Sequence, residues 1–154
     1  MVGRILTYAP TSHFDVILRG INALQDELNW FQDKARERQL NLNIEKQSTC
    51  AEYCIFMNKL TEMSYPIQAT ALWEIELAYN QGWQLPGEML MPYNEFANRW
   101  GNPEFTNYVK LLEAQANDVL ASASKTVQSQ SEATFLNVAR LEKDFWQMAY
   151  NATN

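Results

Sequence analysis

Two carboxylates on one predicted helix have a spacing that limits the chemistry they could share. Residues 66–83 are apolar almost all the way round apart from Glu74 and Glu76, and a helix of that kind lies in the middle of a domain. At about 100° per residue, Glu76 shares a face with Tyr79, whereas Glu74 points nearly the opposite way. One pocket can therefore use one of these acids and not both. Glu76 is the better candidate because Tyr79 and two large apolar side chains flank it.

A third carboxylate, Glu142, falls on the apolar stripe of the last predicted helix, between Val138 and Phe145. Burying a charge there costs several kcal/mol unless the charge is paired or protonated. The side chain is therefore either a core glutamate bonded to a Tyr, Trp or Arg, or one half of an acid/base pair with Glu76. Four aromatic residues could line such a pocket: Tyr53, Tyr79, Trp83 and Trp100.

The sequence lacks the residues that metal sites, phosphate-binding loops and nucleophilic serine sites require. The only histidine, His13, is expected to be an ordinary residue near a helix start, so a di-iron centre with two Glu-x-x-His units is excluded. Cys50 and Cys54 match no zinc or redox spacing and are expected to be small core residues, which favours a reducing compartment. There is no Gly-rich phosphate loop and no Gly-x-Ser-x-Gly motif. We expect neither a metal nor an organic cofactor.

Composition predicts a single all-α domain over residues 1–154. The chain is 47% hydrophobic and has only five glycines and five prolines, with helix-forming residues throughout. Its formal charge of −6, without a long basic cluster, argues against nucleic-acid and anionic-membrane partners. No apolar stretch of membrane-spanning length and no signal peptide is visible, so we expect a cytoplasmic protein.

Periodicity and capping signals predict the helices that would position these residues. Residues 1–8 resemble the end of a helix, and long helices are expected over residues 12–38, 66–83 and 103–121. Thr49 with Glu52, and Ser129 with Glu132, have capping-box spacing, which predicts helix starts at both places and a loop over residues 121–131. A short helix is expected to include Trp100, and Asn102 is expected to cap the helix that follows.

Four segments together resemble a known family. The chain is similar to the TenA/thiaminase II group of the haem-oxygenase-like all-α proteins, and within it to the branch that has Glu where better-known members have Cys. The similarity covers nearly the whole chain from about residue 3. It rests on residues 27–31 (Glu-Leu-Asn-Trp-Phe), 72–79 (Leu-Trp-Glu-Ile-Glu-Leu-Ala-Tyr), 93–105 (Tyr-Asn-Glu-Phe-Ala-Asn-Arg-Trp-Gly-Asn-Pro-Glu-Phe) and 141–146 (Leu-Glu-Lys-Asp-Phe-Trp).

The resemblance implies a haem-oxygenase-like helical bundle and roles for particular residues. Glu142 matches the family's C-terminal catalytic glutamate, and Tyr53 matches a tyrosine that stacks on a pyrimidine ring. Glu76 matches the acid of the Glu-type branch, while the nucleophile of Cys-type members would fall at or next to Glu74, which is not a cysteine. Trp100 falls where Cys-type members have a tyrosine.

The implied activity is hydrolysis of an amino- or formylamino-pyrimidine derived from thiamin. Glu142 and Glu76 would be the catalytic pair, and the substrate-binding residues would be Tyr53, Tyr79, Trp100 and Glu74. A small pyrimidine is thus the expected ligand, with no cofactor. The alternative is a binding or scaffolding protein that has kept the fold without catalysis.

The family pattern also includes about two earlier helices, with a Gln-Asp-Tyr segment, and the given sequence begins after that segment. We therefore expect an uncovered apolar face that another copy of the chain covers, in a homo-oligomer. The expected contact includes Val2, Ile5 and Leu6.

Overall fold

A computed structural model of the chain describes residues 1–152, all of whose regular secondary structure is helical. The all-α prediction is confirmed. The helices are α1 (Val2–Ile5), the 3-10 helix η1 (Thr11–His13), α2 (Phe14–Glu37), α3 (Ser48–Leu60), α4 (Tyr65–Gln84), α5 (Asn94–Trp100), α6 (Pro103–Ala121) and α7 (Lys125–Ala152).

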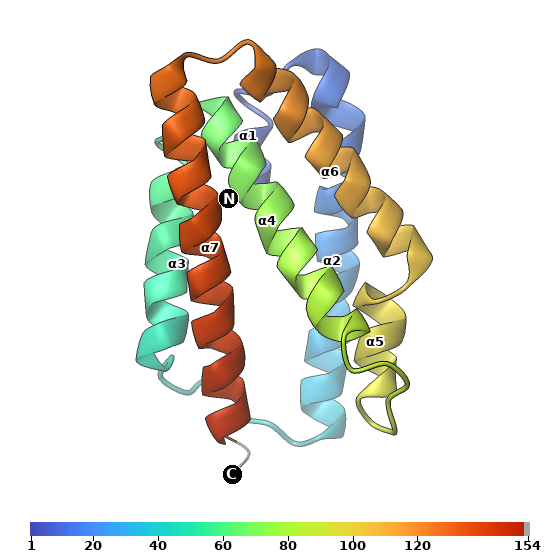
Figure 1. Cartoon of the computed structure of the whole chain (residues 1–154). Helices are drawn as coiled ribbons and strands as arrows, with labels where there is room; N and C mark the ends of the chain where they lie inside the picture. The colour runs from blue at the N-terminus through green and yellow to red at the C-terminus, as the bar shows by residue number, and fades with distance from the viewer. Residues whose placement is uncertain (153–154) are drawn as a thin grey trace.

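Helix α4 is the centre of the bundle, as its apolar circumference predicts. It crosses obliquely between α7 and α6, and these are the two helices with which it has its most extensive contacts (Figure 1). Helix α3 packs beside α7, and α1 and α2 lie behind α4 (Figure 1). Side chains on opposite sides of α4, such as Glu74 and Glu76, therefore face different neighbouring helices.

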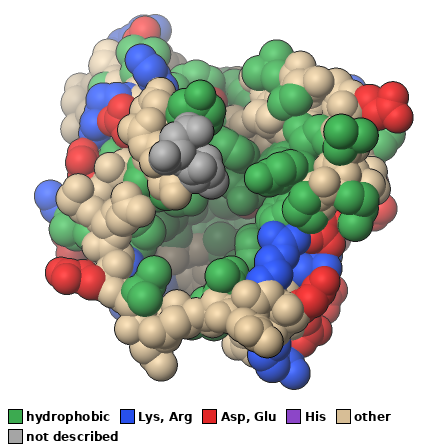
Figure 2. Space-filling view, turned by 90° about the horizontal axis from the view of Figure 1, so that it is seen from below, with side chains coloured by type: hydrophobic (Ala, Val, Ile, Leu, Met, Phe, Trp, Pro, Cys, Tyr) green, Lys and Arg blue, Asp and Glu red, His purple; other side chains and the backbone are tan. Residues whose placement is uncertain are grey.

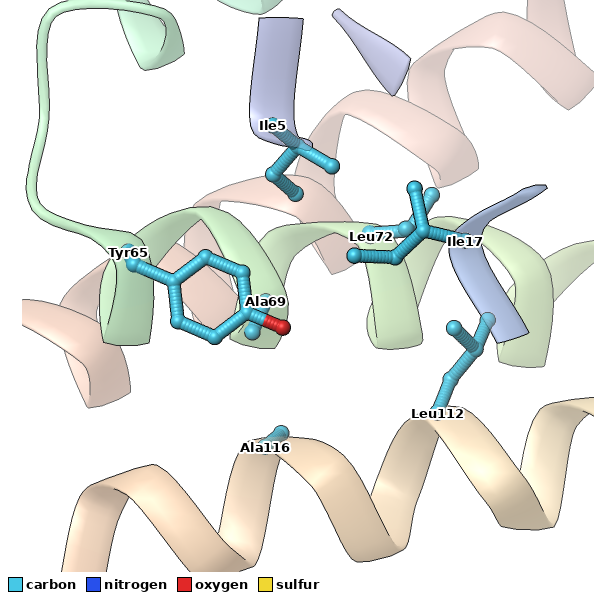
Figure 3. Packing of buried hydrophobic residues seen from close by; sticks show 7 residues of the cluster. All are labelled: Ile5, Ile17, Tyr65, Ala69, Leu72, Leu112 and Ala116. Atoms are coloured by element: carbon cyan, nitrogen blue, oxygen red, sulfur yellow. The ribbon is translucent and has the colours of Figure 1, made fainter. Parts of the chain in front are cut away.

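One core cluster joins α4 to the helices behind it. It contains Ile5, Ile17, Tyr65, Ala69, Leu72, Leu112 and Ala116 (Figure 3). Ile5 is only 1% exposed, so the expectation that it lies in an intermolecular contact is wrong. The short helix α1 uses Ile5 to fill the protein's own core, because it packs against α2 and α4, and the α6 residues of the cluster, Leu112 and Ala116, complete it from the other side (Figure 3).

His13 belongs to the interior and not to a wet helix start. It is 5% exposed, and its Nδ1 lies 2.8 Å from the Tyr65 hydroxyl. Its Nε2 is 3.4 Å from an oxygen of Asp118, and its backbone oxygen accepts a hydrogen bond from Gln115. The histidine thus joins the start of α2 to α4 and α6.

Three of the predicted helix boundaries can be compared directly with the structure. Asn102 caps α6, since its side-chain oxygen accepts a hydrogen bond from the backbone N–H of Phe105. The other two capping boxes are wrong: α3 begins at Ser48 after an N-cap at Gln47, and α7 begins at Lys125, so that Ser129 lies inside the helix. Ser129 and Glu132 also fit a helix interior, where positions three apart share a face.

Several large apolar side chains of α2 are exposed to solvent. Leu24, Leu28 and Phe31 are 42%, 55% and 43% exposed. Figure 2, which views the molecule toward the end where α2 and α7 finish, shows a hollow with largely hydrophobic walls. Among residues 1–152, no helix combines the length and apolarity needed to cross a bilayer.

Candidate functional site

Glu142 lies at the meeting point of α3, α4 and α7. It follows Val138 and Leu141 on the buried side of α7, and it is 5% exposed. One of its oxygens, Oε1, accepts a hydrogen bond from the Tyr53 hydroxyl of α3. The other, Oε2, is buried and has no hydrogen-bond partner in residues 1–152. Glu142 is therefore half-satisfied, which is unusual for a buried carboxylate.

The pKa values of these two groups reflect their surroundings. Burial raises the pKa of Glu142, and the hydrogen bond from Tyr53 offsets part of that rise by stabilising the carboxylate form. Burial, and then the charge of Glu142, raise the pKa of Tyr53 far above its ordinary range. Tyr53 thus remains a protonated donor to Glu142 at neutral pH.

Glu76 lines a pocket on the other side of α4, between α2 and α6. This α2–α6 pocket has a volume of about 270 Å³, and Glu27 and Tyr108 line it together with Glu76. Burial raises the pKa of Glu76 to about 8, with smaller contributions from the charges of Glu27 and Glu142. At pH 7 Glu76 is mostly protonated and can act as a proton donor.

Glu74 faces a different space, an open depression on the surface between α4 and α7. The side chains that line this α4–α7 depression include Glu74, Glu142, Lys143 and Trp146. Glu74 is 6% exposed, and burial and the Glu142 charge raise its pKa to about 7. The expected separation of Glu74 from Glu76 is thus confirmed. The expectation that Glu76 and Glu142 face one cavity while Glu74 lies elsewhere is wrong: Glu76 lines the α2–α6 pocket, and Glu142 lines the α4–α7 depression with Glu74, because α7 packs along the flank of α4 that Glu74 occupies.

Tyr53 connects the three acids. After burial, the charges that raise its pKa are those of Glu142, Glu76 and Glu74, in that order. Since Coulomb interactions fall with distance, the Tyr53 hydroxyl lies within electrostatic reach of carboxylates on both faces of α4. The acids therefore form one coupled cluster although they open into different spaces.

Trp100 is packed more tightly than a free stacking surface would be. It is 2% exposed, its ring stacks on Phe31, and Tyr79 meets it edge-on at 5.2 Å between centroids. Its indole N–H donates to Glu27 at 2.8 Å. In this structure Trp100 orients Glu27, and Tyr79 is a half-buried member of the same aromatic cluster.

Sequence reasoning gave no role to Glu27 or Tyr108. Glu27 does lie three residues after Leu24 and four before Phe31, so it interrupts an apolar stripe in the same way as Glu142. Tyr108 is positioned by a close approach to α2: a Cβ added at Gly20 would lie 2.3 Å from its hydroxyl. Gly20 is thus needed because of its missing side chain, which no helix pattern reveals.

Histidine, cysteine and carboxylate side chains are too dispersed to suggest a metal site. In residues 1–152 no three of them are grouped so that they could hold an ion. Cys50 and Cys54 are free and half-buried on α3, and burial raises the pKa of the Cys50 thiol.

The chain matches known proteins over most of its length. The model of the TENA/THI-4/PQQC family matches residues 6–152. A probable bifunctional TENA-E protein from Glycine max is 31% identical over 146 aligned positions, and the alignment covers 88% of this chain. The match spans 62% of that relative's own length.

The fold has a solved counterpart. The X-ray structure of a TenA homologue from Pyrococcus furiosus superimposes with a TM-score of 0.90 and 27% sequence identity, covering 97% of this chain and 74% of the homologue. The predicted family and its all-α fold are therefore confirmed, and the chain belongs to the TENA/THI-4/PQQC family.

Proposed function

We propose that the protein hydrolyses the amine or formamide substituent of an aminopyrimidine derived from thiamin, as a Glu-type TenA enzyme. The observation that carries the proposal is the coupled cluster of Tyr53, Glu142 and Glu76, in which two acids on different helices have raised pKa values. Functional acid/base pairs are built in this way, with burial used to move carboxyl pKa values toward neutral pH.

The two acids have different roles in this proposal. Glu76, with a pKa of about 8, gives its proton to the departing amine nitrogen as the carbon–nitrogen bond breaks. Glu142 accepts a proton from water as the new carbon–oxygen bond forms, since the hydrogen bond from Tyr53 favours its ionised form. For a formamide, the water attacks the formyl carbon and the same two proton transfers release formate and the amine.

The α2–α6 pocket suits a single-ring ligand. Its volume of about 270 Å³ is just below the range of ~300–1,000 Å³ common for ligand pockets. Glu27 and Glu76 on its wall can accept hydrogen bonds from ring amino groups. Tyr53, Tyr79 and Trp100, which were expected to surround the ligand, are not among the lining residues, and Trp100 is linked to the pocket through its hydrogen bond to Glu27. Stacking of Tyr53 on the ring stays a prediction. The expected direct contact of Glu74 with the substrate is not part of this proposal, because Glu74 lines the α4–α7 depression and not the α2–α6 pocket.

A turnover assay with three variants tests the proposal. Aminomethyl- and formylaminomethyl-pyrimidines are incubated with the full chain, and ammonia and formate are measured. We expect Glu142→Gln and Glu76→Gln each to lower kcat by about 10²–10⁴-fold, the usual contribution of a general acid or base. Glu113→Gln changes the same charge at an exposed position of α6 and serves as the control. Equal activity in all three variants would contradict the acid/base roles.

Two further expectations belong to the same proposal. A homo-oligomer is supported by the exposed Leu24, Leu28 and Phe31 of α2, and not by Ile5. Light scattering at micromolar concentration decides it, and a monomer would exclude it. A cytoplasmic location is supported by the free thiols of Cys50 and Cys54.

Should the chain bind the pyrimidine tightly without turning it over, the binding-protein alternative would replace the enzyme proposal.

A further inference from the structure

Two acids of the α4–α7 depression, Glu74 and Glu142, each have a buried carboxylate oxygen that lacks a hydrogen-bond partner among the described residues. Glu74 is 6% exposed and Glu142 is 5% exposed. The unpaired atom is Oε2 in both residues. Both side chains line the same depression. An unpaired buried carboxylate oxygen is costly, and here two of them occur together.

A proton shared by the two acids would give each unpaired oxygen a hydrogen-bond partner. Two neighbouring carboxylates cannot both ionise at low cost. Three other ionisable groups lie near the pair. Tyr53 from α3 donates to Oε1 of Glu142, Glu76 lies on the far face of α4, and Lys143 lies on the exposed rim of the depression. The rise in the pKa of Glu74 to about 7, in part from the charge of Glu142, agrees with this arrangement.

We propose that Glu74 is a positioning residue that shares a proton with Glu142 and connects that otherwise buried acid to solvent through the α4–α7 depression. Its part in turnover rests on the proposed function. Water in the active site loses a proton to Glu142 as its oxygen bonds to carbon. That proton then passes to Glu74 and leaves to solvent through the α4–α7 depression.

The first test needs no substrate. Carboxyl carbons of the glutamates are followed by NMR from pH 4 to 10 in the wild type, in Glu142→Gln and in the control Glu113→Gln. Because the Glu142 charge contributes to the raised pKa of Glu74, we expect the Glu74 midpoint to fall in Glu142→Gln and to stay unchanged in the control. An unchanged Glu74 midpoint in Glu142→Gln would overturn the proton-sharing proposal.

The second test asks whether the pair acts during turnover. We expect Glu74→Ala to lower kcat about tenfold with KM within twofold, because Glu74 acts through Glu142 and not on the substrate. Added formate should restore activity in Glu74→Ala, since a small carboxylate in the vacated space can accept the proton. Formate should leave Leu77→Ala, a truncation in the same depression, unaffected.

The outcomes separate this proposal from the proposed function. A coupled titration together with formate rescue supports both. A coupled titration in a chain that hydrolyses none of the pyrimidines keeps the proton-sharing pair and removes the enzyme proposal. Full activity of Glu74→Ala at every pH, or a tenfold loss that formate leaves unchanged, overturns the role of Glu74 as the connection to solvent.

Discussion

Replacing Glu76 by glutamine should change how the stability of the protein depends on pH. The pKa of Glu76 is about 8 in the folded protein, against an ordinary value of 4.5. A carboxyl whose folded pKa is raised favours folding most while it stays protonated, and its contribution is lost as the pH rises from the unfolded toward the folded pKa. Between about pH 5 and pH 8, the folded wild type therefore holds a proton that the unfolded chain releases.

The magnitude follows from the size of the pKa difference. Each pH unit in this window lowers the free energy of unfolding by about 1.4 kcal/mol, so Glu76 alone accounts for up to about 5 kcal/mol between pH 4.5 and 8. Relaxation of the pocket and entry of water reduce that figure, and about 2–5 kcal/mol is the expected range. Glutamine keeps the shape and cannot ionise, so Glu76→Gln should become more stable than the wild type as the pH rises.

Urea unfolding followed by helical circular dichroism at pH 5, 6, 7 and 8 measures this effect. The difference in unfolding free energy between Glu76→Gln and the wild type should increase in favour of the variant across the series. The exposed-site control Glu113→Gln should run parallel to the wild type. A Glu76→Gln series that also runs parallel to the wild type would refute the conclusion that Glu76 is mostly protonated at neutral pH in the folded protein.

Three further predictions concern the packing around the site. Gly20→Ala should cost about 1–3 kcal/mol of unfolding free energy because the new Cβ meets the Tyr108 hydroxyl, and combining it with Tyr108→Phe should recover part of that loss; additive losses in the double variant would contradict the clash. Asn102→Ala should cost about 1 kcal/mol through loss of the α6 cap, and an unchanged urea midpoint would argue against the cap. Trp100→Phe should cost at least ~1.5–3 kcal/mol, because Glu27 loses its donor, and a smaller loss would mean that this bond is weak.

The central features of the fold could be predicted because they depend on local patterns. An apolar circumference places residues 66–83 at the centre, and α4 is observed there. The Asn102-Pro103 pair predicts the start of α6 because the cap and the first-turn proline act within three residues. Glu142 was identified by one acid on an apolar stripe, and its burial at 5% exposure agrees with that signal.

Features that depend on contacts between helices were missed or wrong. His13 is buried by Tyr65 and Gln115, which lie 52 and 102 residues away in sequence. The presence of Glu142 and Glu74 in one depression depends on which flank of α4 is covered by α7, and the phase of one helix contains no information on its neighbour's position. The role of Gly20 likewise depends on a side chain of α6.

Hydrolysis in ¹⁸O-labelled water tests the central claim most directly. The full chain is incubated with an aminomethylpyrimidine, and the products are analysed by mass spectrometry for oxygen content and for ammonia. A C–N hydrolase that uses Glu142 and Glu76 should release ammonia and a labelled pyrimidine alcohol in equal amounts, and Glu142→Gln should form both products about 10²–10⁴-fold more slowly while retaining binding. Saturable binding of the pyrimidine by the wild type with neither product formed would contradict the claim.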